Sequence, residues 1–147
     1  MDFNFSDDQE QLRDAVRKWV DKGYDFERRR GIVAHGGFSR EAYTELAELG
    51  LTGLYIPEAL GGLGMGPVEG MVVMEELGRG IVLEPLNQAL MAGAMLSYYA
   101  GQDLQEAWCA KVASGEALVV LAAQERKARY DLSVCNAVAQ KQGNGWT

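Results

Sequence analysis

The sequence predicts a mainly α-helical fold, in which a helical bundle over residues 1–115 is followed over residues 116–147 by the first strands of a truncated β-domain. Before residue 115, apolar residues recur three and four positions apart in several segments, which is the period of amphipathic helices. Between residues 56 and 79, a glycine-dense loop runs directly into an apolar helix. After residue 116, a short continuous apolar run replaces the helical period, which indicates a buried strand.

The composition is that of a globular protein and excludes some partners. The chain has 147 residues, 48% of them hydrophobic, which is enough for one domain with its own core. Its formal charge of −7 argues against nucleic acid or an anionic membrane as a partner, since both are bound through basic clusters. We expect the one basic run, residues 28–30, to be a solvated turn.

The cysteines and the first residues of the chain indicate in which cellular compartment the protein is located. Cys109 and Cys135 make neither a disulfide framework nor a zinc site, so we predict no metal. The first residues lack the basic and apolar regions of a signal peptide, and no uncharged run is apolar enough for a membrane span. We therefore expect a cytoplasmic location and no membrane partner.

Two helices are expected before the glycine loop. Ser6 begins the first with a capping box closed by Gln9, and this helix ends near Gly23. Its apolar face consists of Leu12, Ala15, Val16, Trp19 and Val20. The pattern then fails over residues 24–38, where we expect a loop with His35 facing solvent. Ser39 caps the second helix, and Gly50 ends it. The buried stripe of this helix is Tyr43, Leu46, Ala47 and Leu49.

The glycine loop leads into the helix that we expect to be most buried. Residues 51–56 should run extended into a proline. The loop glycines, which supply positive φ or close backbone approach, are Gly61, Gly62, Gly64 and Gly66. Pro67 stands where the first turn of a helix tolerates a missing N–H. The helix over residues 67–79 is apolar on most of its circumference, and Glu75 and Glu76 are expected as surface or capping charges.

Two further helices and two strands complete the expected elements. The first helix covers residues 86–99, with an apolar ridge, and the next opens with a capping box over residues 103–106. Residues 117–123 should form a buried strand, and residues 133–139 a second one that ends in a turn at 143–145. Because two strands make no stable sheet, we expect the protein to continue beyond Thr147.

Two motifs link this order of elements to a known family. Pro-Glu followed by Gly-Gly-x-Gly is present as Pro57, Glu58, Gly61, Gly62 and Gly64. Glu-Glu-Leu-Gly is present as residues 75–78. With these motifs, essentially the whole chain resembles the acyl-CoA dehydrogenase family. A glycine-rich loop alone would indicate only a tight turn, and this one matches no nucleotide-binding fingerprint.

The resemblance implies the amino-terminal part of an FAD-dependent enzyme that oxidises an acyl-CoA thioester to the 2-enoyl-CoA. It further implies that the helix over residues 86–99 lines the slot for the acyl chain, although its period alone fits an ordinary core helix. The implied substrate-binding residues are Leu90, Met91, Ala94, Met95 and Tyr130. The implied flavin-binding residues are Leu121, Ala123, Gln124, Glu125 and Tyr130.

The segment over residues 124–131 departs from the family's Thr-Glu-Pro-x-Ala-Gly-Ser-Asp pattern. Three positions match it, namely Glu125, Ala128 and Asp131. Gln124 keeps a hydrogen-bonding amide, whereas Arg129 replaces a glycine and removes its backbone freedom. Tyr130 places a phenol where the family has a small hydroxyl, and either Arg126 or Arg129 could meet a phosphate of the cofactor or of CoA.

The family's proton-abstracting carboxylate belongs to a later helical bundle, so we assign no catalytic residue here and expect residues 1–147 alone to be inactive. The implied partners are acyl-CoA, an electron acceptor similar to electron-transfer flavoprotein, and further subunits of a homo- or hetero-oligomer. Two alternatives remain. One is a degenerate subunit of a heteromeric acyl-CoA dehydrogenase, favoured by the altered segment after Glu125. The other is a non-enzymatic helical interaction module.

Overall fold

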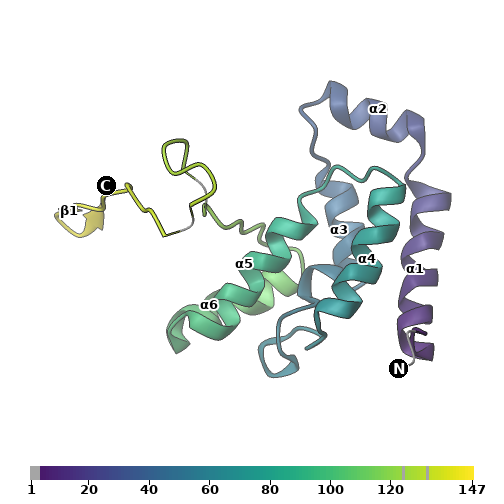
Figure 1. Cartoon of the computed structure of the whole chain (residues 1–147), viewed down its shortest axis with the longest axis horizontal. Helices are drawn as coiled ribbons and strands as arrows, with labels where there is room; N and C mark the ends of the chain where they lie inside the picture. The colour runs from purple at the N-terminus through teal and green to yellow at the C-terminus, as the bar shows by residue number, and fades with distance from the viewer. Residues whose placement is uncertain (1–3, 124, 132) are drawn as a thin grey trace.

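The computed structural model describes residues 4–123, 125–131 and 133–147. Figure 1 shows a helical bundle from which the segment after the last helix extends as an irregular chain toward a short hairpin. The α-helices are α1 (Asp7–Gly23), α2 (Phe26–Ala34), α3 (Arg40–Glu48), α4 (Pro67–Arg79), α5 (Leu86–Tyr99) and α6 (Gln102–Ala113). The 3-10 helices are η1 (Leu51–Gly53) and η2 (Glu58–Leu60), and the strands are β1 (Lys141–Gln142) and β2 (Gly145–Trp146). The predicted mainly α fold is confirmed.

The main core lies where α1, α3, η1, α4 and α5 meet. Its buried members are Val16, Val20, Leu46, Leu51, Leu54, Val73, Leu77, Leu86 and Leu90. A second cluster joins the glycine loop to α6 through Ile56, Cys109, Val112 and Ala113. None of the helices in the described part of the chain has the length and hydrophobicity to cross a bilayer.

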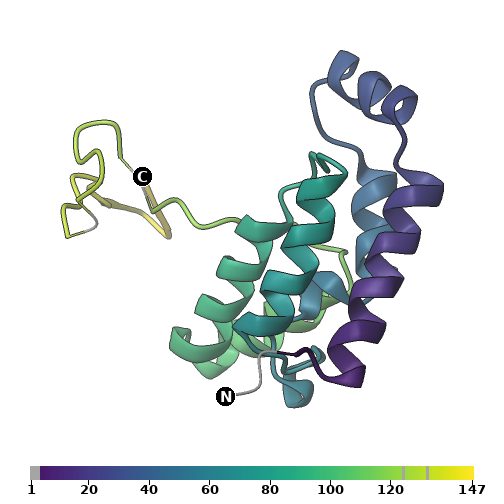
Figure 2. The ribbon, with the colours of Figure 1, turned by 45° about the vertical axis from the view of Figure 1, so that its right-hand side comes forward.

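The first helix begins as predicted, with Ser6 and Gln9 bonding each other's backbone amides at 3.3 and 3.0 Å. The loop predicted for residues 24–38 is wrong, because α2 begins after Asp25, whose carboxylate accepts a hydrogen bond from the amide of Arg28. Figures 1 and 2 show α2 lying across one end of the bundle. It buries only Ile32, so it has no apolar stripe that a sequence pattern could detect. His35 is exposed at its end, as predicted.

The basic run of α2 is not a solvated turn, which corrects the sequence prediction. Arg28 forms an ion pair with Glu45 of α3 at 2.7 Å, and Arg29 donates to the carbonyl of Gly80 at 2.8 Å. Among the described residues, Arg30 pairs only with Glu27, on the exposed face of the same helix. Two of the three arginines therefore tie α2 to the bundle.

The segment before the glycine loop is tightly turned and not extended, contrary to prediction. Gly50 takes a φ of 76°, and residues 51–54 are buried in η1 and the turn after it. Buried backbone amides need partners, and here the amides of Gly53 and Leu54 find them three residues back, at Gly50 and Leu51. A local turn thus provides hydrogen-bond partners for buried backbone amides, whereas an extended strand would need a neighbouring strand to provide them.

The glycine loop behaves largely as predicted. Gly61 and Gly64 have φ of 90° and 61°, which favours glycine, and Pro67 is the first residue of α4. Gly66 has no positive φ; it is the N-cap residue of α4, and its amide donates to Glu69 at 2.9 Å. At Gly62, an added Cβ would lie 2.1 Å from the carbonyl oxygen of Ile56.

The prediction that α4 is the most buried helix is wrong. Five residues of α4 are buried, whereas α5 has six buried residues. In α4, Val68 and Met71 are 45% and 54% exposed. An apolar circumference shows what a helix can bury, whereas the packing of its neighbours decides which side is covered. Here the side facing α1 and the core is covered.

The predicted bounds of α5 are confirmed, whereas the predicted N-cap of α6 is wrong. The bounds of α5 agree with the prediction, but its ridge divides, since Leu90 is buried while Met91 and Met95 are exposed. The capping box predicted over residues 103–106 is absent, because α6 begins at Gln102 after Gly101, which has no side chain to cap it. Asp103 instead lies in the first turn, where the helix dipole favours an anion.

Neither predicted strand is present among the described residues. Residues 117–123 are irregular: Ala117 and Val119 pack against the second cluster, while Val120 and Leu121 are exposed. Residues 133–139 are also irregular where described. A strand requires a paired neighbour, and the described residues provide one only in the short antiparallel hairpin, where Lys141 faces Trp146. Its turn at Gly143 agrees with the prediction.

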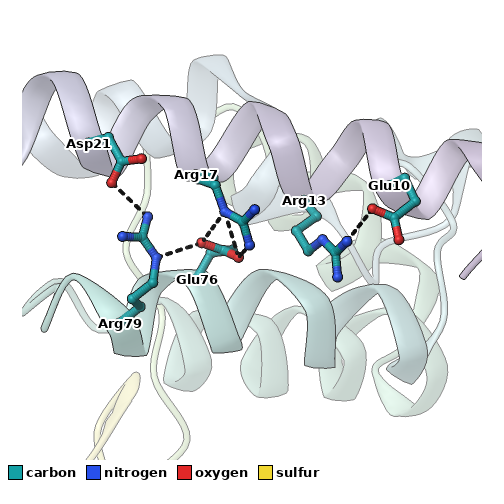
Figure 3. Close-up of polar contacts among 6 residues, drawn as sticks. All are labelled: Glu10, Arg13, Arg17, Asp21, Glu76 and Arg79. Atoms are coloured by element: carbon teal, nitrogen blue, oxygen red, sulfur yellow. Dashed lines mark hydrogen bonds and ion pairs between the residues drawn. The ribbon is translucent and has the colours of Figure 1, made fainter.

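An ion pair between a buried carboxylate and half-exposed arginines joins α1 to α4 (Figure 3). The carboxylate of Glu76 lies 2.5 Å from Nη2 of Arg17 and 2.9 Å from Nε of Arg79, whose Nη2 reaches Asp21 at 2.8 Å. Glu76 is only 2% exposed, so its predicted place among surface or capping charges is wrong; Glu75 is exposed as predicted. Hydrogen bonds from Arg17 above all, and from Arg79, hold the pKa of Glu76 below its usual value.

We expect Glu76→Gln to lower the free energy of unfolding by about 2–3 kcal/mol, because a buried amide cannot replace a carboxylate between two guanidinium groups. Urea unfolding of the two chains measures the difference. Glu75→Gln, on the exposed side of the same helix, is the matched control and should change stability by less than about 0.5 kcal/mol. Equal effects of the two substitutions would contradict a stabilising role for the buried pair.

Acid should remove the contribution of Glu76. Because its pKa is lower in the folded chain, the unfolded chain takes up the proton first, and the stabilisation present above the ordinary pKa of 4.5 is lost as pH falls through the folded value. We expect the stability difference between the chain and Glu76→Gln to narrow between pH 7 and pH 3. A difference that stays constant over this range would contradict the prediction.

Candidate functional site

The predicted substrate residues of α5 separate into one core residue and an outer face. Leu90 is 1% exposed and belongs to the main core. Met91 and Met95 are 47% and 43% exposed, and four residues apart they adjoin on the helix surface. Ala94 is half-buried beside them. The structure therefore offers three of the four residues, and not Leu90, to a ligand.

One apolar pocket lies where the glycine loop, the start of α4 and α5 meet. It has a volume of about 220 Å³ and is lined by Tyr55, Met65, Gly66, Pro67, Ala94 and Tyr98. Tyr55 can lie over α4 because Gly70 has no side chain, since an added Cβ there would be 1.7 Å from the tyrosine hydroxyl. Sequence reasoning missed Tyr55, Met65 and Tyr98 as lining residues, because no spacing links three such distant segments.

A second apolar pocket lies between α5 and the irregular segment after α6. Its volume is about 280 Å³, and its lining consists of Ala92, Met95, Leu96, Tyr99, Ala100 and residues 119–121. It brings together Met95, predicted to face the substrate, and Leu121, predicted to face the flavin. Pockets lined mainly by apolar side chains suit hydrocarbon or flat aromatic groups.

The other predicted flavin residues that the structure describes, Ala123, Glu125 and Tyr130, line neither of the two pockets beside α5. Gln124 is outside the described residues, and Ala123 is exposed. The carboxylate of Glu125 accepts hydrogen bonds of 2.9 Å from the backbone and side chain of Asn136 and from the amide of Ala137. These hydrogen bonds lower the pKa of Glu125, and the bond from the side chain of Asn136 has the largest effect. The same bonds join Glu125 to residues 136 and 137 and so close a loop.

Tyr130 belongs to a third pocket, of about 490 Å³, which it lines with Glu125, Arg126 and Arg129. Its side chain is 92% exposed, and no residue of α5 lines this pocket. Arg129 has a φ of 52°, a left-handed backbone conformation that glycine adopts most readily. No group of three metal-binding side chains was found among the described residues.

Comparison with known proteins identifies relatives over most of the chain. Residues 6–116 match the family described as acyl-CoA dehydrogenase, N-terminal domain. The chain is 35% identical over 145 residues to (2S)-methylsuccinyl-CoA dehydrogenase of Cereibacter sphaeroides, covering 93% of this chain and 25% of that protein. It is 31% identical over 152 residues to glutaryl-CoA dehydrogenase of Desulfococcus multivorans, covering 99% and 39%.

Among solved structures, the glutaryl-coenzyme A dehydrogenase glutaryl-CoA complex matches with a TM-score of 0.83 and 28% identity. The match covers 99% of this chain and 38% of that one. The chain thus spans between 25% and 39% of the length of these relatives.

The glycine loop that forms one wall of the first pocket should tolerate no added methyl group at Gly62. We expect Gly62→Ala to lower the free energy of unfolding by about 3 kcal/mol or more, because the new Cβ would overlap backbone oxygens of Ile56 and Gly53. Gly78→Ala, on the open side of α4, is the control and should gain up to about 1 kcal/mol from helix propensity. Thermal unfolding checks both, and a neutral Gly62→Ala would contradict the expectation.

Proposed function

The chain belongs to the acyl-CoA dehydrogenase family, as its motifs predicted, and we propose that it forms the amino-terminal part of an enzyme that oxidises an acyl-CoA thioester to the 2-enoyl-CoA. The observation that carries this proposal is the outer face of α5, with an apolar pocket on either side of it. We further propose that residues 1–115 form one domain and that residues 116–147 begin a second.

The proposed task of this part is to bind and orient the acyl chain. Ala94 and Met95 would contact the chain from one helix, each within a different pocket. Apolar walls in both pockets would shield part of a bound acyl chain from water, which strengthens electrostatic interactions near the reacting atoms. No described residue is proposed to remove the α-proton. Glu125 is hydrogen-bonded within its own loop, and Glu76 is paired with two arginines.

FAD is the proposed cofactor, and the residues present fit one edge of it. When bound, a flavin accepts the hydride that leaves the β-carbon. Leu121 has an exposed apolar side chain within the same pocket as Met95, a placement that suits the side of a flat ring next to an acyl chain. Ala123 and Tyr130 are proposed as further contacts, with Gln124 outside the described residues.

Acyl-CoA is the proposed substrate, and an acceptor similar to electron-transfer flavoprotein the proposed electron partner. We also propose assembly with further subunits. Two of the relatives are named for (2S)-methylsuccinyl-CoA and glutaryl-CoA, and on that basis short acyl chains with a second carboxylate are the first substrates to test.

One observation favours a second candidate, a degenerate subunit of a heteromeric acyl-CoA dehydrogenase. In the turn after Glu125, two arginines and a tyrosine occupy positions where the family has proline, glycine and serine. A loop changed in this way could have lost its contact with flavin while the helical domain still binds a catalytic partner.

Flavin content and activity of the whole protein test these proposals. We expect the purified protein that contains this chain to be yellow, with one FAD per subunit, and to reduce an artificial electron acceptor when given an acyl-CoA. Flavin and activity only after co-expression with a homologue would favour the degenerate subunit. A colourless protein that is inactive under both conditions would contradict both, and would favour the interaction module.

A substitution in the first pocket should act on substrate use and spare the flavin. In the whole protein we expect Ala94→Phe to lower kcat/KM for acyl-CoA tenfold or more with unchanged FAD content, because the ring fills a pocket of about 220 Å³. Ala94→Ser, which hardly changes volume, is the control. Values of kcat/KM within twofold for both variants would contradict the placement of the acyl chain on this side of α5.

A further inference from the structure

The end of the bundle that α2 crosses carries exposed apolar side chains from two distant segments (Figure 1). Phe26 and Val33 of α2 are 62% and 59% exposed, and Ile81, in the loop between α4 and α5, is 59% exposed. Arg29 joins the two segments. Its guanidinium group lies 5.5 Å from the ring centroid of Phe26 and donates to the carbonyl of Gly80 at 2.8 Å. We call Phe26, Val33 and Ile81 the α2 patch.

Ile81 has a backbone conformation that its side chain disfavours. Its φ is 51°, in the left-handed region, where a β-branched residue is strained. The amides of Ile81 and Val82 donate to the carbonyls of Gly78 and Leu77, both at 3.0 Å, an arrangement that usually has glycine at this position. Because Ile81 is also largely exposed, its side chain contributes little apolar burial to the fold. An exposed, strained isoleucine therefore indicates a contact with another molecule.

The exposed charges of α2 balance. Two of the three arginines of this helix are held within the bundle. The charged side chains that remain are Glu27 and Arg30, which pair with each other at 2.7 Å. Phe26, Arg30 and Val33 follow one another four and three residues apart, so they share one face of the helix. A face with one charge of each sign has no net charge to attract an acidic protein or a lipid surface.

Such a face is complementary to a second copy of itself. In a two-fold interface, two antiparallel α2 helices place Phe26 of each copy opposite Val33 of the other. The same axis brings Glu27 of each copy beside Arg30 of the other, because residues 27 and 30, like residues 26 and 33, lie on either side of residue 29. Two apolar contacts and two ion pairs therefore form together.

We propose that the α2 patch is an interface between two copies of this chain, formed by antiparallel α2 helices and by Ile81 of each copy. Glu27 and Arg30 exchange their ion pairs across the two-fold axis and so set the register of the two helices. A patch of this size makes a weak interface, and we expect a dissociation constant between about 1 µM and 1 mM. Oxidation of acyl-CoA plays no part in the proposal, so its failure would not contradict the proposed function.

Sedimentation equilibrium of the chain tests the interface. Glu27→Arg and Arg30→Glu should each weaken the dimer about tenfold or more, because like charges then meet across the axis. An equimolar mixture of the two variants should regain the affinity of the unchanged chain, since the arginines of one variant then face the glutamates of the other. Glu106→Arg, with the same change of charge on exposed α6 surface away from α2 (Figure 1), is the matched control and should change the dissociation constant less than about twofold.

Ile81→Gly separates the effect on the fold from the effect on the interface. Glycine relieves the left-handed strain, so the melting temperature of the dilute, monomeric chain should rise. The dimer should weaken about fivefold or more, because each copy loses an apolar contact. Far-UV circular dichroism verifies that each variant is folded.

Three results would overturn the proposal. The first is a chain that stays monomeric at about 1 mM, which would assign the patch to a different partner. The second is a mixture of Glu27→Arg and Arg30→Glu that associates no better than either variant alone. The third is a dimer that Ile81→Gly leaves unchanged.

Discussion

The contact between Glu76 and the two arginines is the constraint on which the arrangement of the bundle depends. A carboxylate that is 2% exposed is costly unless it is neutralised. Arg79 of the same helix supplies one guanidinium group, and Arg17 supplies the second only when α1 and α4 lie in one register, with Arg17 opposite Glu76. Asp21 extends the same contact through Arg79. Apolar packing between these helices tolerates some sliding, whereas this buried charge does not.

Close backbone contact at glycine then places the first pocket relative to that pair of helices. At Gly53, an added Cβ would lie 2.9 Å from Cβ of Ala113 in α6, and Gly62 lies against the backbone of the same loop. Gly70 admits the ring of Tyr55 onto α4. The segment over residues 53–66 therefore contacts α6 through Gly53 and α4 through Tyr55. These contacts keep Tyr55, Met65 and Gly66 beside α5, where they line the first pocket. A binding surface built on helices and a packed loop keeps its shape better than one on a free loop.

The predicted site residues divide into two physically different regions. The outer face of α5 is apolar and continues into residues 119–121, which suits an acyl chain and the edge of a flat cofactor. The turn after Glu125 is cationic, lies away from α5, and carries an aromatic ring.

Local signals in the sequence determined much of the secondary structure, and tertiary packing decided the rest. The capping box at Ser6, the cap at Ser39 and the glycines before Pro67 act within a few residues, so their effects could be inferred without the fold. Helix α2 has no apolar stripe, and the apolar run over residues 117–123 has no strand to pair with among the described residues, so local patterns misassigned both. The burial of Glu76, the separation of Leu90 from Met91 and Met95, and the pockets on either side of α5 depend on which elements pack together. Such contacts join residues far apart in sequence, and no local pattern encodes them.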